Sequence, residues 1–234
     1  MLQNLIMNNI KVIAFDADDT LWINEPLFQG VEKKFCDMME DFLPHHTVSR
    51  ELLSVEIANM AIYGYGVKAF ILSMVETAIK ISEGTISAGS IEEIINLGKE
   101  LLNAPVENID GVEEVLKALQ GRYRLVMATK GDLLDQERKL KKSGLAKYFH
   151  HTEIVSEKNE AEYERLIKHL DIPAEQFLMI GNSLKSDVIP ILNIGGYGFH
   201  VPYHTTWAYE KVDKKIEHPN FRQLKRIVEV LDYV

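Results

Sequence analysis

The sequence predicts an α/β fold, in which a parallel β-sheet is covered by helices on both faces. Five short runs are mainly apolar and do not alternate strictly with polar residues, which is typical of strands that are buried on both faces. Helical patterns separate the later runs, and strands that alternate with helices indicate a parallel sheet. The five runs cover residues 11–15, 123–128, 153–155, 177–180 and 196–201.

Four helical patterns accompany the later runs. The first begins after Asp110, a residue type that often caps helices, and repeats apolar residues every three or four positions. The second ends before Gly144, and glycine is a common C-terminal signal of helices. These helices are expected over about residues 112–119, 133–142, 160–170 and 188–192.

One long stretch interrupts the alternation of strands and helices. From about Leu27 to Asn103 the apolar residues recur only at helical spacings, which indicates about four helices between the first and second strands. We therefore expect an inserted helical domain over residues 21–104, and a core domain made of residues 1–20 and 105–234. The linkers are expected near residues 21–26 and 104–108.

Composition and charge narrow the class of protein. The 234 residues are 46% hydrophobic and 26% charged, which is ordinary for a globular protein. The formal net charge of -9 argues against a nucleic-acid partner, although it does not exclude a small anionic substrate. Cys36 is the only cysteine, so no intrachain disulfide can form and a reducing compartment is expected. The chain has no run of about 18 apolar residues, so we expect no membrane span and a cytoplasmic location.

The carboxyl ends of parallel strands are where ligands bind in such sheets, so the residues that follow each run carry the functional interpretation. Asp16, Asp18, Asp19 and Thr20 follow the first run. Two carboxylates two residues apart can divide the roles of nucleophile and acid/base. The structural alternative is a turn, because Asp and Thr are common turn residues.

Polar residues also follow the second and third runs. Thr129 is followed by Lys130 and Gly131, and a hydroxyl with free N–H groups at a helix start can hold phosphate oxygens. A simple helix cap is the alternative. Lys158 follows the third run, where its charge would hold a phosphate and a carboxylate together if it pointed into the site. The alternative for Lys158 is a solvated surface position.

The fourth run is followed by Gly181, Asn182 and Ser183, and then by Asp187. Oxygen ligands near the two aspartates of the first strand end suit a hard cation such as Mg²⁺. The alternative is a helix-start turn that is capped by Asn182 or Ser183.

Taken together, these strand ends resemble the motifs of the haloacid dehalogenase superfamily. Asp16, Asp18 and Thr20 match its first motif, DxDx(T/V), and Thr129 matches its second. The other two matches are Lys158 for the third motif and the segment Gly181–Asp187 for the acidic fourth motif. The resemblance covers the whole chain and implies a Rossmann-like, three-layer α/β/α core, with residues 21–104 as a C1-type helical cap domain.

The resemblance also implies a chemistry. Asp16 would be the nucleophile that forms an aspartyl phosphate, and Asp18 the general acid and base, oriented by Thr20. The phosphate would be held by Thr129, Lys130, Gly131 and Lys158. Mg²⁺ would be held by Asp16, Asp18, and Asn182 or Asp187. The expected substrate is a small phosphorylated metabolite, hydrolysed as a phosphate monoester.

Two departures from the family pattern leave alternatives open. Asn182 stands where the fourth motif usually has its first acid, which motivates a non-catalytic phosphate- or partner-binding protein as a second interpretation. Asn159 stands where a proline often follows the lysine of the third motif, and Lys130 and Lys185 are other cations near the expected site. A haloacid dehalogenase is the third interpretation, but such enzymes attack carbon and generally lack an equivalent of Asp18.

Overall fold

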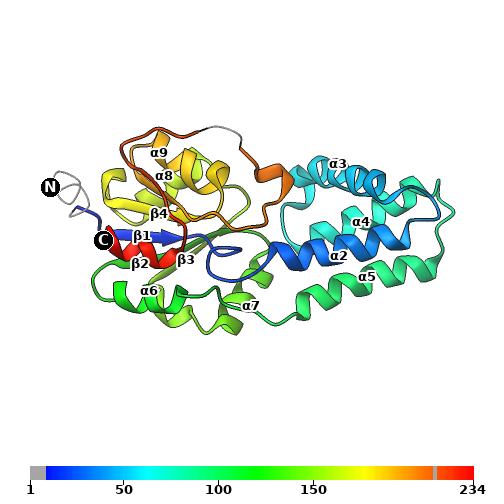
Figure 1. Ribbon diagram of the computed structural model, residues 1–234, viewed down its shortest axis with the longest axis horizontal. Coiled ribbons are helices and arrows are strands. Elements are labelled where there is room, and N and C mark those ends of the chain that lie inside the picture. Colours follow the sequence, from blue (N-terminus) through cyan, green and yellow to red (C-terminus); the bar gives the residue numbers. More distant parts are fainter. Residues whose placement is uncertain (1–8, 213–214) are drawn as a thin grey trace. The chain divides into compact units, whose positions relative to one another are not determined.

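The computed structural model describes residues 9–212 and 215–234, and it has the α/β architecture that the sequence predicts (Figure 1). Within the described residues, one sheet has the strand order β3-β2-β1-β4-β5-β6, and every neighbouring pair is parallel. The strands are β1 (Val12–Phe15), β2 (Arg124–Lys130), β3 (His151–Val155), β4 (Phe177–Gly181), β5 (Tyr197–His200) and β6 (Phe221–Gln223).

The first five strands are the five apolar runs of the sequence, with bounds that shift by one or two residues. The sixth, Phe221–Gln223, was not predicted because it is only three residues long and just one of them is apolar. It lies at the edge of the sheet beside β5, where only one side of a strand is hydrogen bonded.

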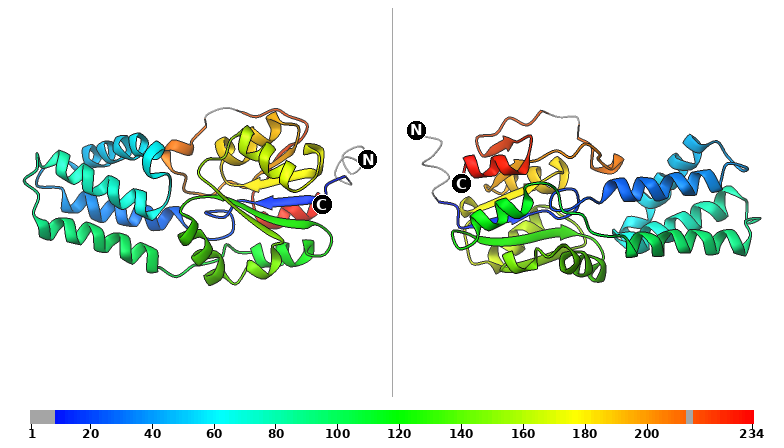
Figure 2. Two further views of the ribbon diagram at one scale, coloured as in Figure 1. Left: turned by 180° about the vertical axis from the view of Figure 1, so that it is seen from behind. Right: turned by 60° about the horizontal axis from the view of Figure 1, so that its bottom comes forward.

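Helices cover both faces of the sheet (Figure 2), and successive side chains of β1 point alternately to one face and to the other. Ile13 and Phe15 face a cluster that includes α6 (Val112–Leu119) and the C-terminal 3₁₀ helix Ile227–Asp232. Val12 and Ala14 face the opposite cluster, which includes α8 (Glu160–His169) and α9 (Ile189–Asn193). Both faces of β1 are therefore buried in apolar side chains, which is why its sequence is apolar throughout.

The start of α6 differs from the sequence prediction. The residue that caps its N-terminus is Gly111, with a left-handed φ of 85° and no side-chain hydrogen bond, so the prediction of Asp110 as the cap was wrong. A side chain at position 111 would also be crowded, because a Cβ there would lie 2.4 Å from a methyl group of Val228. Backbone conformation and close packing select glycine at this position.

The four helices between β1 and β2 form a compact bundle with a core of its own. They are α2 (Glu25–Met38), α3 (His45–Tyr63), α4 (Val67–Ile81) and α5 (Ala88–Asn103). Phe35, Met74 and Ile94 are fully buried at its centre. The bundle buries its apolar stripes within itself, which accounts for the helical periodicity of this part of the sequence.

Contacts divide the chain into two compact units. The core unit runs to Ile23, resumes over Val106–Lys130 and continues from Arg138. The helical unit comprises Asn24–Pro105 together with Gly131–Glu137, a segment that includes the first turn of α7 (Leu133–Ser143). The sequence pattern predicts this second segment as part of the core domain. A role of the helical unit as a cap stays a prediction.

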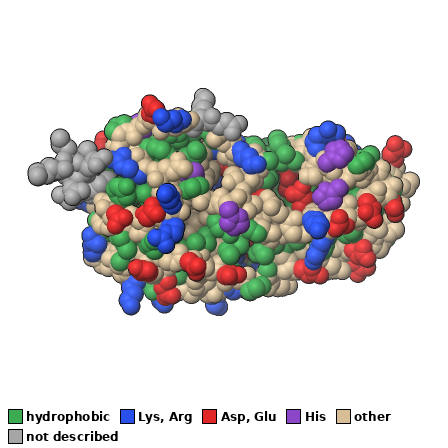
Figure 3. All heavy atoms as spheres, in the orientation of Figure 1, with side chains coloured by type: hydrophobic (Ala, Val, Ile, Leu, Met, Phe, Trp, Pro, Cys, Tyr) green, Lys and Arg blue, Asp and Glu red, His purple; other side chains and the backbone are tan. Residues whose placement is uncertain are grey.

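The described residues contain no candidate membrane span, and the face seen in Figure 3 mixes charges of both signs. In residues 9–212 and 215–234 no helix has both the length and the apolar character needed to cross a membrane. Acidic, basic and apolar side chains are interspersed over the face seen in Figure 3.

Candidate active site

The topology brings three of the predicted strand ends together. The central strand β1 pairs with β2 on one side and β4 on the other, with Phe15 opposite both Met127 and Ile180. The next residue, Asp16, donates its backbone N–H to the carbonyl of Ile180 at 2.9 Å. The side chains that follow these strands therefore lie at one edge of the sheet.

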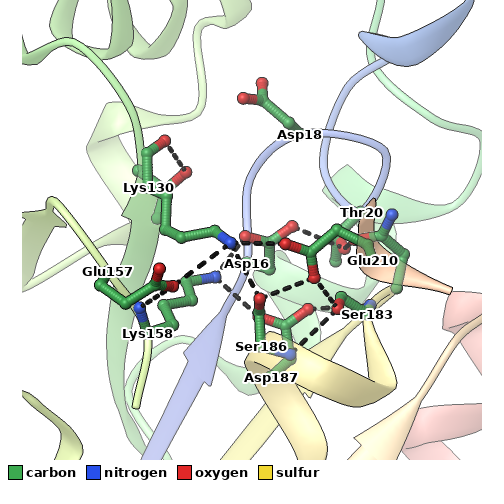
Figure 4. A network of polar contacts seen from close by, with 12 residues as sticks. Asp16, Asp18, Thr20, Lys130, Glu157, Lys158, Ser183, Ser186, Asp187 and Glu210 are labelled. Carbon is green, nitrogen blue, oxygen red and sulfur yellow. Dashed lines mark hydrogen bonds and ion pairs between the residues drawn. The ribbon is translucent and has the colours of Figure 1, made fainter. Parts of the chain in front are cut away.

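Asp16, Lys158 and Asp187 form a buried ionic cluster at this edge (Figure 4). The Lys158 ammonium donates to Asp16 Oδ1 and, at 2.7 Å, to Asp187 Oδ1. The Lys158 side chain is only 3% exposed, so this residue points into the site and is not a solvated surface lysine. Three of the residues that the sequence singled out, from three separate motifs, are thus in direct contact.

The cluster carries more negative than positive charge, since two carboxylates share one ammonium. Burial raises the pKa of Asp16 to about 7, with Lys158 opposing that rise and Asp187 adding to it. Burial alone would lower the pKa of Lys158, but the carboxylates of Asp16 and Asp187 outweigh it and hold that pKa above its ordinary value. Lys158 is therefore a permanent cation, and when both carboxylates are ionised the cluster carries one negative charge in excess.

Thr20 contacts the nucleophile candidate and not Asp18. Its hydroxyl donates to Asp16 Oδ2 at 3.2 Å and lies 3.3 Å from Asn182 Oδ1. The reason is the tight turn after β1, in which the Thr20 N–H bonds to the carbonyl of Ala17 and the hydroxyl points back toward the strand end. The expectation that Thr20 orients Asp18 was wrong, because Thr20 fixes Asp16.

The Asp16 carboxylate, the Asp18 main-chain oxygen and the Asn182 amide face one another. One end of the Asn182 amide lies 3.2 Å from Asp16 Oδ2 and 3.3 Å from the main-chain oxygen of Asp18. If that end is the nitrogen, it donates two hydrogen bonds. If it is the oxygen, three oxygens converge, at separations close to the roughly 3 Å between neighbouring ligands of Mg²⁺ with its bonds of about 2.1 Å. This donor set fits a small hard cation.

Asp187 contacts Lys158 and the backbone of Ser183. Its Oδ1 accepts from Lys158 at 2.7 Å, and its Oδ2 accepts from the backbone N–H of Ser183 at 3.0 Å. It packs so closely on Gly181 that a Cβ at that glycine would lie 2.2 Å from Asp187 Oδ2. Of the two ligand candidates that the sequence left open, Asn182 is the one that faces the oxygens of Asp16 and Asp18.

A cation here would depend on mixed oxygen ligands. Among the residues that the structure describes, no group of three or more His, Cys, Asp or Glu side chains is arranged to hold a metal ion. Carboxylate, main-chain carbonyl and amide oxygens are nevertheless a set that Mg²⁺ accepts, since it commonly keeps several waters and binds through only one or two carboxylates.

Asp18 is held by two residues that sequence reasoning missed. Its Oδ1 accepts from the indole N–H of Trp22 at 2.7 Å and from the Lys139 ammonium at 2.6 Å. Figure 4 shows the Asp18 carboxylate pointing away from Asp16. No strand end marks Lys139, which lies on α7, so only the fold brings it to Asp18.

The end of β2 places the predicted phosphate-binding residues beside the cluster. Thr129 is buried, and its hydroxyl donates to the carbonyl of Lys130 at 3.2 Å. Gly131 follows with a φ of 138°, which favours glycine. The Lys130 ammonium donates to Ser186 Oγ at 2.9 Å and to Glu210 at 2.6 Å. Glu210 belongs to none of the four predicted motifs and gave no signal in the sequence.

Comparison with known families agrees with this geometry. Residues 10–195 match the model of the haloacid dehalogenase-like hydrolase family. A haloacid dehalogenase-like family hydrolase from Xanthomonas campestris, known from a crystal structure, is 41% identical, with a TM-score of 0.84 over 93% of this chain and 87% of that one.

More distant relatives were also found. The pyrimidine 5'-nucleotidase YjjG of Escherichia coli (strain K12) is 25% identical over 200 residues, which cover 78% of this chain and 82% of that protein. The putative hydrolase YfnB of Bacillus subtilis, whose structure is described as bound to magnesium, shares the fold with 18% identity and a TM-score of 0.66, over 95% of this chain and 97% of that one. With the family model spanning most of its length, this chain belongs to the haloacid dehalogenase-like hydrolase family.

Proposed function

We propose that this hydrolase is a Mg²⁺-dependent phosphomonoesterase, which cleaves a small phosphorylated metabolite through an aspartyl-phosphate intermediate on Asp16. The observation that carries the proposal is the buried cluster in which Lys158 joins Asp16 to Asp187. A carboxylate at a strand end, with a fixed cation beside it, is suited to attack a phosphate whose charge must be neutralised.

The residues at the ends of β1, β2 and β3 divide the catalytic roles. Asp16, fixed by Thr20 and Lys158, attacks phosphorus as the bond to the leaving oxygen breaks. The Lys158 ammonium offsets charge on the transferring group. The hydroxyl of Thr129 and the backbone N–H groups of Lys130 and Gly131 hold the phosphoryl oxygens at the end of β2.

Asp18 completes the proposed reaction. Its carboxyl group gives a proton to the leaving alkoxide, and the resulting carboxylate then takes a proton from the water that hydrolyses the aspartyl phosphate. To do so it has to exchange the hydrogen bonds of Trp22 and Lys139 for contact with the substrate. A carboxyl group in this role is needed for an oxygen leaving group and not for a halide, so the dehalogenase interpretation is not favoured.

The cation would be held by three groups of this chain, namely Asp16 Oδ2, the Asp18 carbonyl and the Asn182 amide oxygen. When bound, Mg²⁺ would supply positive charge to a cluster in which two carboxylates share one ammonium, and so would reduce the repulsion between an anionic nucleophile and an anionic phosphate. Asp187 supports the site indirectly, since it holds Lys158 in place.

The proposed substrates are phosphate monoesters of small metabolites, and nucleoside monophosphates are the first to test. The relative named pyrimidine 5'-nucleotidase motivates that choice. We propose that the four-helix part of the helical unit, Asn24–Pro105, serves as the cap that limits access of substrate and water to this chemistry.

The test is a panel of phosphate monoesters assayed with and without Mg²⁺. The purified protein is expected to release phosphate from at least one member, and Asp16→Asn is expected to lower kcat by about 10³-fold or more, as the loss of a nucleophile does. Asp110→Asn is the matched control, because Asp110 is exposed and lies outside the site. Wild-type turnover by Asp16→Asn would contradict the covalent role.

A second function, phosphate binding without catalysis, is supported by one observation. With its nitrogen toward Asp16 and Asp18, the Asn182 amide closes the site through two hydrogen bonds and no cation is needed. An acid at this position could not do so at neutral pH. This function predicts that a phosphate mimic binds, that no ester in the panel is hydrolysed, and that Asn182→Asp confers turnover with Mg²⁺.

A further inference from the structure

Glu210 enters the site from a segment that carries none of the four motifs. It is the last residue of a short 3₁₀ helix, Ala208–Glu210, which follows β5. Its carboxylate accepts hydrogen bonds from the Lys130 ammonium at 2.6 Å, from Ser186 Oγ at 2.7 Å and from Ser183 Oγ (Figure 4). The side chain is only 12% exposed, so these contacts are largely shielded from water.

The pairing with Lys130 is the principal charge contact of both residues within the described network. Lys130 is 14% exposed, and a second carboxylate neighbour, Glu157, is farther away at 3.6 Å and 45% exposed. Burial alone would raise the pKa of Glu210, but Lys130 and the two serine hydroxyls outweigh it and hold that pKa below its ordinary value. Glu210 is therefore a buried anion that neutralises Lys130.

The two serines connect Glu210 to the turn of the fourth motif. The Ser183 N–H donates to Asp187 Oδ2 at 3.0 Å, and the Ser186 N–H donates to Ser183 Oγ at 3.0 Å. Ser183 also follows Asn182 directly in the chain. One carboxylate thus ties the turn that carries Asn182 and Asp187 to the end of β2.

The segment that carries Glu210 is itself anchored to the same turn. The Lys185 ammonium donates to the carbonyl of Tyr209 at 3.0 Å and lies 3.2 Å from the centre of the Tyr209 ring. The Tyr209 ring in turn packs against Trp207, with the ring centres 5.1 Å apart. Lys185 therefore fixes the approach of Glu210, and in this structure it has the role of an anchor.

We propose that Glu210 is a positioning residue for the cation site, because it keeps Lys130 paired and holds the turn that carries Asn182. The inference rests on the proposed function, which places a cation beside Asp16. If Glu210 lost its charge, the Lys130 ammonium would lose the nearest of its described counter-charges, and the site would carry one more net positive charge. The ammonium would then compete electrostatically with the metal ion for the site's carboxylates.

The test measures Mg²⁺ binding directly, by isothermal titration calorimetry at fixed ionic strength. Glu210→Gln is expected to weaken Mg²⁺ binding about tenfold, because it removes a negative charge from the surroundings of the cation site. Lys130→Met has the opposite expectation, namely binding at least as tight as in the wild type, because it leaves the extra negative charge of Glu210. The double variant Lys130→Met/Glu210→Gln is expected to return to within about threefold of the wild type. Glu217→Gln is the matched control, since the Glu217 side chain is 75% exposed.

Two results would overturn the inference on its own. One is an equal Mg²⁺ affinity for Glu210→Gln and Glu217→Gln. Another is a weakening by Lys130→Met that adds to the effect of Glu210→Gln, which would mean that the pair acts only through packing. Thermal melts identify a variant that does not fold, and if Glu210→Gln is such a variant, the sign of the Lys130→Met effect decides. Wild-type protein that neither binds Mg²⁺ nor hydrolyses any ester would contradict the proposed function itself, and this inference with it.

Discussion

Replacing Lys158 by methionine is the perturbation that tests the buried cluster most severely. Methionine keeps much of the apolar stem and removes the ammonium, which donates to both Asp16 and Asp187. The lysine side chain is 3% exposed, and those of Asp16 and Asp187 are 10% and 1% exposed. Water therefore cannot take over the contacts that the variant loses.

The expected loss of stability in Lys158→Met follows from this burial. Removing one partner of a buried ion pair costs about 3–5 kcal/mol, because the remaining charge is left without compensation. Lys158 serves two carboxylates, so we expect a value toward the upper end of this range. For a protein of this size, 4 kcal/mol corresponds to a fall in Tm of about 8–16 °C. The pKa of Asp16, already raised to about 7 by burial against the pull of Lys158, should rise further.

The assay is thermal and urea unfolding at pH 7, with and without Mg²⁺. Lys168→Met is the matched control, because Lys168 is an exposed lysine on α8. We expect Lys158→Met to lose most of its hydrolytic activity, and Mg²⁺ to restore part of its stability, since the cation can replace some of the missing positive charge. If Lys158→Met unfolds within about 2 °C of Lys168→Met, the reasoning from burial and charge is refuted.

Two further predictions concern close packing and titration. Gly181→Ala should abolish activity, because a Cβ at this position would lie 2.2 Å from Asp187 Oδ2 and push that carboxylate away from Lys158. The activity is measured as phosphate release, and a wild-type kcat for this variant would contradict the prediction. Glu56→Gln should stabilise the protein at pH 8 and not at pH 4. Burial, followed by the nearby Glu32 and Glu25, raises the pKa of Glu56 from 4.5 to about 8, so the folded chain keeps a proton that the unfolded chain loses, and stability falls as pH rises through that interval. The full pKa shift implies a gain in unfolding free energy of roughly 4–5 kcal/mol for the variant at pH 8, but we expect about 2 kcal/mol because Glu56 is only partly buried. Equal urea midpoints for the wild type and Glu56→Gln at pH 8 would contradict this prediction.

Much of the fold was predictable because burial on both faces of a sheet leaves a clear mark in the sequence. The five runs became strands for this reason, and the helical periodicity of residues 27–103 became a bundle with its own core. The cap of α6 was not predictable in the same way. Asp110 has the right side chain, but a left-handed backbone at Gly111 decided the start of the helix.

In the site, the residues next to strand ends were predictable and their partners were not. Asp16, Lys158 and Asp187 come from three strand ends, which a parallel sheet necessarily brings to one edge. Glu210 and Lys139 reach the site from a short 3₁₀ helix and from α7, where no spacing marks them. Such contacts join residues that are far apart in the sequence, and the spacing of residues along the chain does not reveal them.

The central claim is that Asp16 becomes phosphorylated, and trapping that intermediate tests it most directly. Asp18→Asn removes the base for the second step and should let the aspartyl phosphate accumulate when a good aryl phosphate is supplied with Mg²⁺. Peptide mass spectrometry after rapid acid quench is expected to find one added phosphoryl group on Asp16, and none when Asp16→Asn is combined with Asp18→Asn. A phosphoryl group on another residue, or ester turnover by the wild type with no phosphoryl-enzyme in the trapped variant, would contradict the account.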